Sequence, residues 1–186
     1  MKWLIAVLMS LSMVTVTIGQ EVKNAKGSKQ ELSQKRKVER KARADSLYQL
    51  TGRILADKEF VLEAERIRNN QGVQVTVSTL LNFISVDSNH VVIQIGSMQR
   101  TGRNGVGGIT EEGRITSWKL TSDDKRSNYS VFMTVQTKIN VYDINLNVDY
   151  SGNADAYLSG LRAGKLIFSG RILPRENSDV FKGMSH

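Results

Sequence analysis

The stretch TGRNGVGGITEEG, residues 101–113, gathers residue types from which a binding site could be built. Glycines let a backbone approach a bound anion closely, and arginine, asparagine and glutamate supply charge and hydrogen bonds. A phosphate loop of the Walker type also needs Gly-Lys-Ser/Thr at the start of a helix, whereas Gly108 precedes Ile109 and Thr110. A dinucleotide fingerprint needs a helix after its glycines, and this stretch lies between two predicted strands, QIGSMQ and GRITSW. The sequence therefore predicts no nucleotide cofactor.

Two other interpretations of this loop stay open. In the first, the glycines allow positive φ angles or close backbone contacts in a wide loop between strands. These glycines are Gly102, Gly105, Gly107, Gly108 and Gly113. In the second, the loop shapes a ligand mouth at the open end of a barrel. The candidate binding residues would then be Arg100, Arg103, Asn104, Glu111 and Glu112.

Two pairs of adjacent carboxylates, Glu111-Glu112 and Asp123-Asp124, could serve acid and base catalysis or calcium binding. Adjacent residues on a strand point to opposite faces, however, and both pairs are predicted to lie in turns, where solvated acids are common. The chain has no cysteine and only two histidines, His90 in a predicted hairpin and His186 at the carboxyl terminus. We therefore expect no metal site, no cofactor and no catalytic set of residues.

The first nineteen residues resemble a secretory signal peptide. Lys2 precedes an uncharged run from Trp3 to Ile18, and small residues favour cleavage after Gly19. A retained membrane anchor is the alternative, but this run is shorter than the roughly 20 apolar residues of a spanning helix. No later stretch is as apolar, and the absence of cysteine excludes a lipoprotein anchor. The sequence predicts a soluble, exported protein, periplasmic or extracellular.

Most of the net charge of +8 lies in residues 23–43, where nine Lys or Arg and two Glu give a net charge of +7. We expect residues 20–57 to form a basic lead-in that becomes a helix from Gln30 to Asp57, with only its second half packed. A solvated lead-in explains this charge, and contact with an anionic envelope lipid or polymer is the alternative. A nucleic-acid partner is not expected for an exported protein.

From Gly72 onward the hydrophobic pattern has a period of two. In VYDINLNVDY, residues 141–150, Tyr142 to Tyr150 alternate with acidic and amide residues. Further runs are predicted to share faces: Tyr129, Val131, Met133 and Val135; Thr116, Trp118 and Leu120; and Leu166, Phe168, Gly170 and Ile172. Turn residues recur between the runs, at 87–89, 123–126, 151–153 and 162–164.

This pattern predicts a mainly β fold with an N-terminal helix. We expect eight or nine strands joined in order as an antiparallel meander over residues 58–175, forming a sandwich or a partly closed up-and-down barrel. Pro174, the single proline, is predicted to fall just after the last strand, and residues 176–186 form a polar tail in which Val180 and Phe181 could dock. The segment 60–70, FVLEAERIRNN, fits a helix by composition and a strand by period two.

Five segments resemble, in order, the exported Bacteroidetes proteins grouped as domain of unknown function family 4251. They are FVLEAERI, LNFISVDSNHVVIQIGS, NGVGGITEEGRIT, INLNVDYSGNADAYLSG and IFSGRILP, within residues 58–175. The resemblance implies that FVLEAERI is the first strand and that a turn follows at residues 70–72. It implies no activity.

Two functions are consistent with these observations. The first is a non-catalytic, exported cell-envelope protein that binds a small apolar or carbohydrate ligand or a protein partner. The alternative is an envelope hydrolase that uses scattered carboxylates. The aromatic residues Trp118, Tyr129, Tyr142, Tyr150 and Tyr157 could stack on sugars, although most of them are expected in the core.

Overall fold

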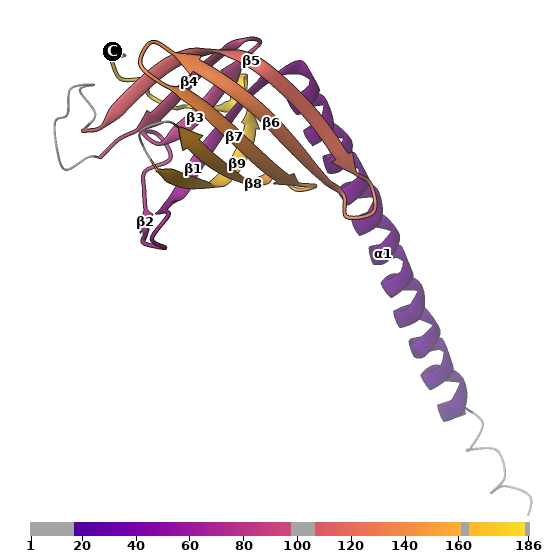
Figure 1. The fold of residues 1–186 in the computed structure, drawn as a ribbon. Helices are drawn as coiled ribbons and strands as arrows, with labels where there is room; N and C mark the ends of the chain where they lie inside the picture. The colour runs from indigo at the N-terminus through magenta and orange to yellow at the C-terminus, as the bar shows by residue number, and fades with distance from the viewer. Residues whose placement is uncertain (1–16, 98–106, 161–163, 185–186) are drawn as a thin grey trace, which may run out of the picture. The chain divides into compact units, whose positions relative to one another are not determined.

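The computed structural model describes residues 17–97, 107–160 and 164–184, with side chains from residue 29 onward (Figure 1). The chain divides into two compact units, residues 1–43 and residues 44–186. In the described part of the first unit, the backbone is helical and every residue from Lys29 to Arg43 is exposed. The second unit contains all of the strands.

The described part of the chain forms one long helix, nine strands and one short 3-10 helix. Helix α1 spans Thr17–Asp57 and the short 3-10 helix η1 spans Arg175–Asn177. The strands are β1 (Glu59–Asn69), β2 (Gln74–Thr76), β3 (Phe83–Asp87), β4 (His90–Ile95), β5 (Ile109–Asp123), β6 (Asn128–Thr137), β7 (Val141–Asp149), β8 (Asn153–Gly160) and β9 (Lys165–Pro174).

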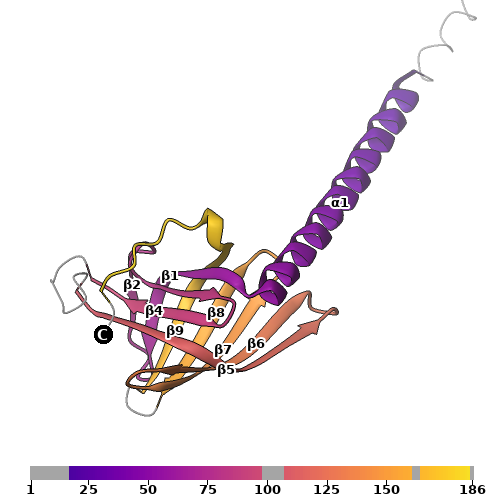
Figure 2. The ribbon, with the colours of Figure 1, turned by 90° about the horizontal axis from the view of Figure 1, so that it is seen from above.

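Eight of these strands form a closed antiparallel barrel. Each strand from β3 to β8 pairs with the next one along the chain, β3 also pairs with β1, and β1 pairs with β9 to close the circle (Figures 1 and 2). Strand β2 lies outside this circle, against residues 66–68 of β1. The predicted mainly β meander is confirmed, as a closed barrel rather than a sandwich, and residues 60–69 of the ambiguous segment lie in strand β1.

The barrel interior is filled by the inward faces of the strands. Ile144, Leu146 and Val148 of β7 are at most 1% exposed, as the alternation in that segment predicts. They join one cluster of twenty buried hydrophobic residues to which every barrel strand except β5 contributes a buried residue, while β5 packs partly buried side chains against it. Eight strands enclose a space that side chains can fill, so the barrel is held together by a dry core.

Two predicted faces are wrong in detail. A bulge between Ile115 and Ser117 shifts the register of β5, so Ile115 rather than Thr116 packs on the core with Trp118. Strand β7 ends at Asp149, which leaves Tyr150 in a turn with 42% of its surface exposed. Period two predicts a face only while the strand continues without an inserted residue.

Helix α1 begins at Thr17, whereas the predicted start was Gln30. The prediction depended on apolar spacing, which the segment before Gln30 lacks. From Ala44 the less exposed residues recur every three or four positions, through Tyr48 and Thr51 to Leu55, which is fully buried in the barrel core. The second half of the predicted helix therefore packs, as expected. No helix in the described part of the chain has both the length and the apolarity to cross a membrane.

The C-terminal segment lies across the outer face of the barrel. Val180 packs on a small second cluster of Val61, Phe83 and Val92, as predicted for a docking residue. The Phe181 side chain is 61% exposed, but its backbone N–H donates to the Leu80 carbonyl at 2.9 Å. These two contacts help to attach the tail to the barrel.

Candidate functional site

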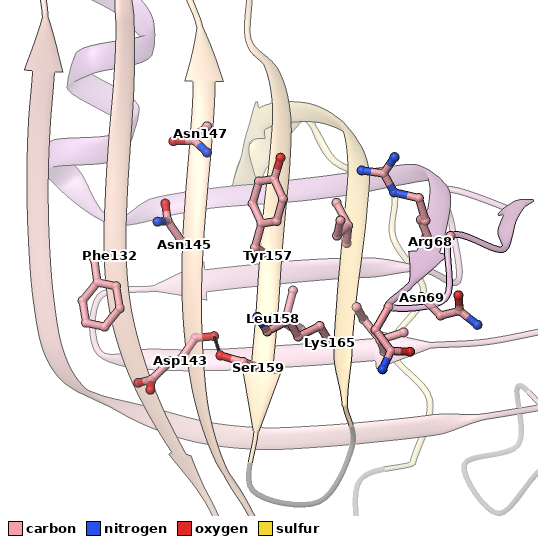
Figure 3. Close-up of a pocket in the computed structure, with 14 residues that line it drawn as sticks. Arg68, Asn69, Phe132, Asp143, Asn145, Asn147, Tyr157, Leu158, Ser159 and Lys165 are labelled. Carbon is pink, nitrogen blue, oxygen red and sulfur yellow. Dashed lines mark hydrogen bonds between the residues drawn. The ribbon is translucent and has the colours of Figure 1, made fainter.

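A groove of about 740 Å³ runs over the outer face of strands β6 to β9 and reaches the end of β1. The strand registers align five of its residues in one row across five strands. Phe132 pairs with Asn145, Asn145 with Tyr157, Tyr157 with Ile167, and Ile167 with Arg68. Figure 3 shows Phe132, Asn145 and Tyr157 on neighbouring strands of this row.

Period two explains why these side chains face outward. On β7 the buried residues Ile144 and Leu146 alternate with Asn145 and Asn147, which must point away from the core. Short hairpins join β6 to β7 and β7 to β8, and they set the register that places Phe132 and Tyr157 on either side of Asn145. Two strand spacings separate the two rings, about 10 Å.

Both aromatic rings in the row are open to solvent. Phe132 is 42% exposed and Tyr157 is 43% exposed, although large apolar groups on a sheet are usually covered. The ring faces supply apolar contact area, and the Tyr157 hydroxyl and the Asn145 amide supply donors and acceptors between them. The row therefore combines apolar surfaces with a hydrogen-bonding group.

Neighbouring polar side chains are oriented by cross-strand hydrogen bonds. The Thr134 hydroxyl donates to Asp143 at 2.8 Å, and the Ser130 hydroxyl donates to the Asn147 side-chain oxygen at 2.8 Å. Asp143 and Asn147 both line the groove, one on each side of Asn145 (Figure 3). These bonds hold two acceptors on the groove floor in fixed positions.

Positive charge lies at one side of the groove. Arg68 and Lys165 line it at β1 and at the start of β9, and Asp143 lies on the opposite side on β7 (Figure 3). Neither cation has a carboxylate within 4.0 Å among the described residues. The groove can therefore offer cationic, anionic and neutral polar groups to one ligand.

The structure places only two of the five candidate loop residues. Arg100, Arg103 and Asn104 lie outside the described residues. Glu111 and Glu112 lie within β5 rather than in the predicted turn, because β5 begins at Ile109 and continues through both. As neighbours on a strand they point to opposite faces, so they do not form one site.

Glu111 enters the barrel, where it is 4% exposed. Its carboxylate accepts hydrogen bonds from the Tyr142 hydroxyl at 2.7 Å, the Thr137 hydroxyl at 2.7 Å and the Asn140 amide at 3.1 Å. Burial and the hydrogen bond to Glu111 raise the pKa of the Tyr142 hydroxyl well above its ordinary range, so this hydroxyl remains a donor. The network lies at the end of the barrel opposite to Leu55.

Glu112 lies on the outer face, between two basic groups. Its carboxylate is 3.1 Å from the His90 ring Nε2 and 2.7 Å from the Lys182 ammonium. Lys182 belongs to the C-terminal segment, and His90 is an exposed hairpin residue, as the sequence predicts. This contact helps to hold the tail to β5.

The described glycines of the loop region are required by the backbone, through close contacts or a positive φ angle. A Cβ at Gly108 would lie 1.9 Å from the Ile95 carbonyl oxygen, and one at Gly113 would lie 2.6 Å from the Gln136 carbonyl oxygen. Gly107 has a φ of +73°. Gly102 and Gly105 lie outside the described residues. Close backbone contact therefore explains Gly108 and Gly113, and the positive φ explains Gly107.

The cavity in the barrel interior is too small for a ligand of the usual size. The cavity at the Glu111 end has a volume of about 80 Å³, well below the 300 Å³ or more that is typical of ligand pockets. Within the described ranges, no three Asp, Glu or His side chains are grouped so that they could hold a metal ion. The outer groove is therefore the stronger candidate site.

Sequence reasoning named Tyr157 as a possible sugar-stacking residue but did not find the groove. Trp118, Tyr129 and Tyr142 pack against the core, as expected, whereas Tyr157 and Tyr150 are exposed. Phe132 could have indicated the groove, because it is an aromatic residue between the buried Val131 and Met133 and therefore points to the opposite face of the strand. Period two places such a residue on the wet face, where it needs an explanation.

The family described as "Domain of unknown function (DUF4251)" matches residues 42–172 of this chain. The structure is similar to the crystal structure of a DUF4251 family protein from Bacteroides eggerthii DSM 20697, with 25% sequence identity and a TM-score of 0.61. That similarity covers 73% of this chain and 93% of the other. A comparison with curated proteins finds no match. Since the family match spans more than half of the sequence, this chain belongs to the DUF4251 family.

Proposed function

We propose that this protein is a non-catalytic binding module of the cell envelope and that it binds a carbohydrate chain in the outer groove. The observation that carries the proposal is the row in which two exposed rings, Phe132 and Tyr157, lie on either side of the Asn145 amide. Export to the envelope is part of the proposal and rests on the resemblance of residues 1–19 to a signal peptide.

A sugar ring has an apolar face of C–H groups and a rim of hydroxyls. The ring faces of Phe132 and Tyr157 match the first, and the oriented oxygens of Asp143 and Asn147 match the second. Two rings roughly 10 Å apart would contact separate units of one chain. An extended, open groove on a sheet suits a chain better than it suits a compact small molecule.

The geometry gives less support to the other two candidates. A small apolar ligand would need an enclosed apolar pocket, and the interior cavity holds about 80 Å³. A carboxylate hydrolase needs two carboxyl groups on either side of the scissile bond. Asp143 is the one carboxylate among the fourteen residues that line the groove.

Isothermal titration of the protein against soluble oligosaccharides, chosen from a glycan array, tests the proposal. Tyr157→Ala and Phe132→Ala should each weaken binding about tenfold, since each removes a central aromatic contact. Tyr150→Ala is the matched control, because Tyr150 is 42% exposed and does not line the groove. All three variants should keep the wild-type unfolding midpoint.

The proposal fails if the array and the titrations show no glycan binding by the wild-type protein. It also fails if Tyr150→Ala weakens binding as much as Tyr157→Ala does. Cleavage of the bound oligosaccharide, detected by mass spectrometry, would instead favour the hydrolase.

A second proposed contact involves the basic segment 23–43 and an anionic lipid surface. Each residue of 29–43 is exposed, and this part carries seven Lys or Arg against two Glu. Since no face of it is apolar enough to insert, the attraction would be electrostatic and sensitive to salt.

Co-sedimentation with vesicles tests this contact. The protein should bind phosphatidylglycerol vesicles at low salt and be released at high salt, and should not bind phosphatidylcholine vesicles. Replacing Lys35, Arg36 and Lys37 with Gln should reduce binding. Replacing the exposed Lys119, Lys125 and Arg126 with Gln removes the same charge from the barrel and should not. Equal losses in both variants would contradict a specific role for the basic segment.

A further inference from the structure

We infer that the Glu111 end of the barrel is a second binding site, one that takes the ammonium group of a small primary amine. The carboxylate of Glu111 would pair with the ammonium, and the apolar wall of the adjoining cavity would cover a short alkyl chain. Leu158 and Leu166 line both this cavity and the outer groove, but Glu111 lines the cavity alone. The inference does not depend on carbohydrate binding.

The first argument is a buried carboxylate without a cation. Glu111 is 4% exposed, and no Lys, Arg or His of the described residues lies within 4.0 Å of its oxygens. Its three partners, Thr137, Asn140 and Tyr142, are neutral donors. Buried charges in proteins are usually paired or bound to an ion, because removing a charge from water is unfavourable.

The second argument is the shape and lining of the cavity beside it. Glu111 and Tyr142 are the polar side chains on a wall that is otherwise made by residues such as Ile93, Ile95, Leu158 and Leu166. The volume of about 80 Å³ leaves room for roughly five water-sized groups. A chain of two to four carbons with one ammonium group fits this size and this division between charge and apolar surface.

Other cations fit this site poorly. Calcium takes six to eight oxygen ligands and magnesium takes six, whereas Glu111 and Tyr142 supply the side-chain oxygens among the described residues that line the cavity. Softer metals prefer imidazole or thiolate ligands, and neither type is found among the described residues that line it. An alkylammonium ion needs one carboxylate and an apolar wall.

The hydrogen-bond network also allows an alternative to cation binding, in which Glu111 is protonated and neutral. The Thr137 hydroxyl has one proton, and it lies within bonding distance of both the Glu111 carboxylate at 2.7 Å and the Asn140 carbonyl at 3.0 Å. If Glu111 were protonated, it would donate to Thr137, and Thr137 would donate to Asn140. Glu111 would then be neutral and would not need a cation, so the experiment must separate these two states.

Thermal unfolding and isothermal titration at neutral pH, with methylammonium, ethylammonium and propylammonium chloride as probes, provide the test. The melting temperature should rise with amine concentration, and the titration should give a saturable isotherm. Ethanol and propanol, which have similar shapes but no charge, should have no such effect, and potassium chloride at equal concentration controls for ionic strength.

Glu111→Gln is the decisive variant, because it keeps the size and most hydrogen bonds of the side chain but removes its charge. It should abolish the amine-dependent rise, while Glu112→Gln, whose carboxylate lies on the outer face, should retain it. Leu158→Phe, which fills the cavity, should also abolish the rise if the variant folds. The inference is overturned if no amine binds the wild-type protein, if Glu111→Gln responds equally, or if the alcohols act as well as the amines.

Discussion

The rings of Tyr48 and Tyr129 stack with their centroids 4.5 Å apart and an interplanar angle of 19°. Tyr48 comes from α1 and Tyr129 from β6, and two hydrogen bonds support the stack. The Tyr48 hydroxyl donates to Asp124 at 2.7 Å, and the Tyr129 hydroxyl donates to the Tyr48 carbonyl at 3.2 Å. Gly52 makes room for this contact, since a Cβ there would lie 2.4 Å from the Tyr129 hydroxyl oxygen. The last turns of α1 are therefore part of the barrel domain.

We expect Tyr48→Ala to lower the free energy of unfolding by about 2 kcal/mol, because it removes a stacked ring and a hydrogen bond together. Tyr48→Phe should lose only the bond to Asp124, about 0.5 to 1 kcal/mol. Urea denaturation followed by circular dichroism measures both. Gln49→Ala, at an exposed neighbouring position, should stay within about 0.5 kcal/mol of the wild-type protein. A similar loss in Gln49→Ala would contradict a specific role for the stack.

The buried side chain of Gln94 attaches the C-terminal segment to the barrel. Its amide nitrogen donates to the carbonyls of Leu81 and Phe181, and its oxygen accepts from the Thr110 hydroxyl and from the Gly183 N–H at 2.7 Å. Gln94→Leu should remove these four hydrogen bonds and release the tail. Hydrogen exchange should then speed up at Gly183, and stability should fall by about 2 kcal/mol. Gln136→Leu, at an exposed site, should leave the exchange at Gly183 unchanged.

The turn between β7 and β8 predicts a specific dependence of stability on pH. Partial burial acts to raise the pKa of Asp149, but hydrogen bonds from Ser151 and Asn153 outweigh it and hold the pKa below its usual value. A lowered pKa in the folded state stabilises the protein above the unfolded pKa of about 3.9, and this stabilisation is lost as the pH falls through the folded value. Asp149→Asn should therefore be less stable by about 1 kcal/mol above pH 5.

Urea denaturation of the wild type and of Asp149→Asn, between neutral pH and strongly acid conditions, checks the predicted direction of the pH dependence. The difference between wild type and Asp149→Asn should be constant above about pH 5 and should shrink in acid. A difference that grows as the pH falls would contradict the assignment. Asp179→Asn, which changes an exposed acid outside this turn, serves as the comparison.

Closure of the barrel depends on the close approach of β9 to β1 at Gly170. A Cβ at this position would lie 1.9 Å from the Glu63 carbonyl oxygen, next to the bulge between Ala64 and Arg66. Gly170→Ala should therefore force the backbones apart and cost about 1 to 3 kcal/mol or more. Ser169→Ala, the adjacent control, loses only a hydrogen bond to Asp155 on the outer face. Equal unfolding midpoints for Gly170→Ala and the wild type would show that the contact relaxes without cost.

Part of the candidate site could be predicted from the sequence. The alternation in β7 places Asn145 and Asn147 on the wet face, and Glu111 and Glu112 on opposite faces once β5 is known to be a strand. The alignment of Phe132 with Tyr157 could not be predicted, because these residues are twenty-five positions apart in sequence and meet only through the registers of two hairpins. The wrong face predicted for Thr116 has a similar cause, because the period-two pattern does not reveal the bulge between Ile115 and Ser117.

By itself, the sequence determined which residues of most strands face the core, where the hairpins turn and that the interior would be apolar, because strand geometry is local and the hydrophobic effect acts on each side chain. The tertiary structure decided the pairing of β1 with β9, which turns a meander into a closed barrel, and the register that assembles the groove and buries Glu111. These depend on contacts between residues that are distant in the chain, and their geometry follows from packing, hairpin length and bulges together.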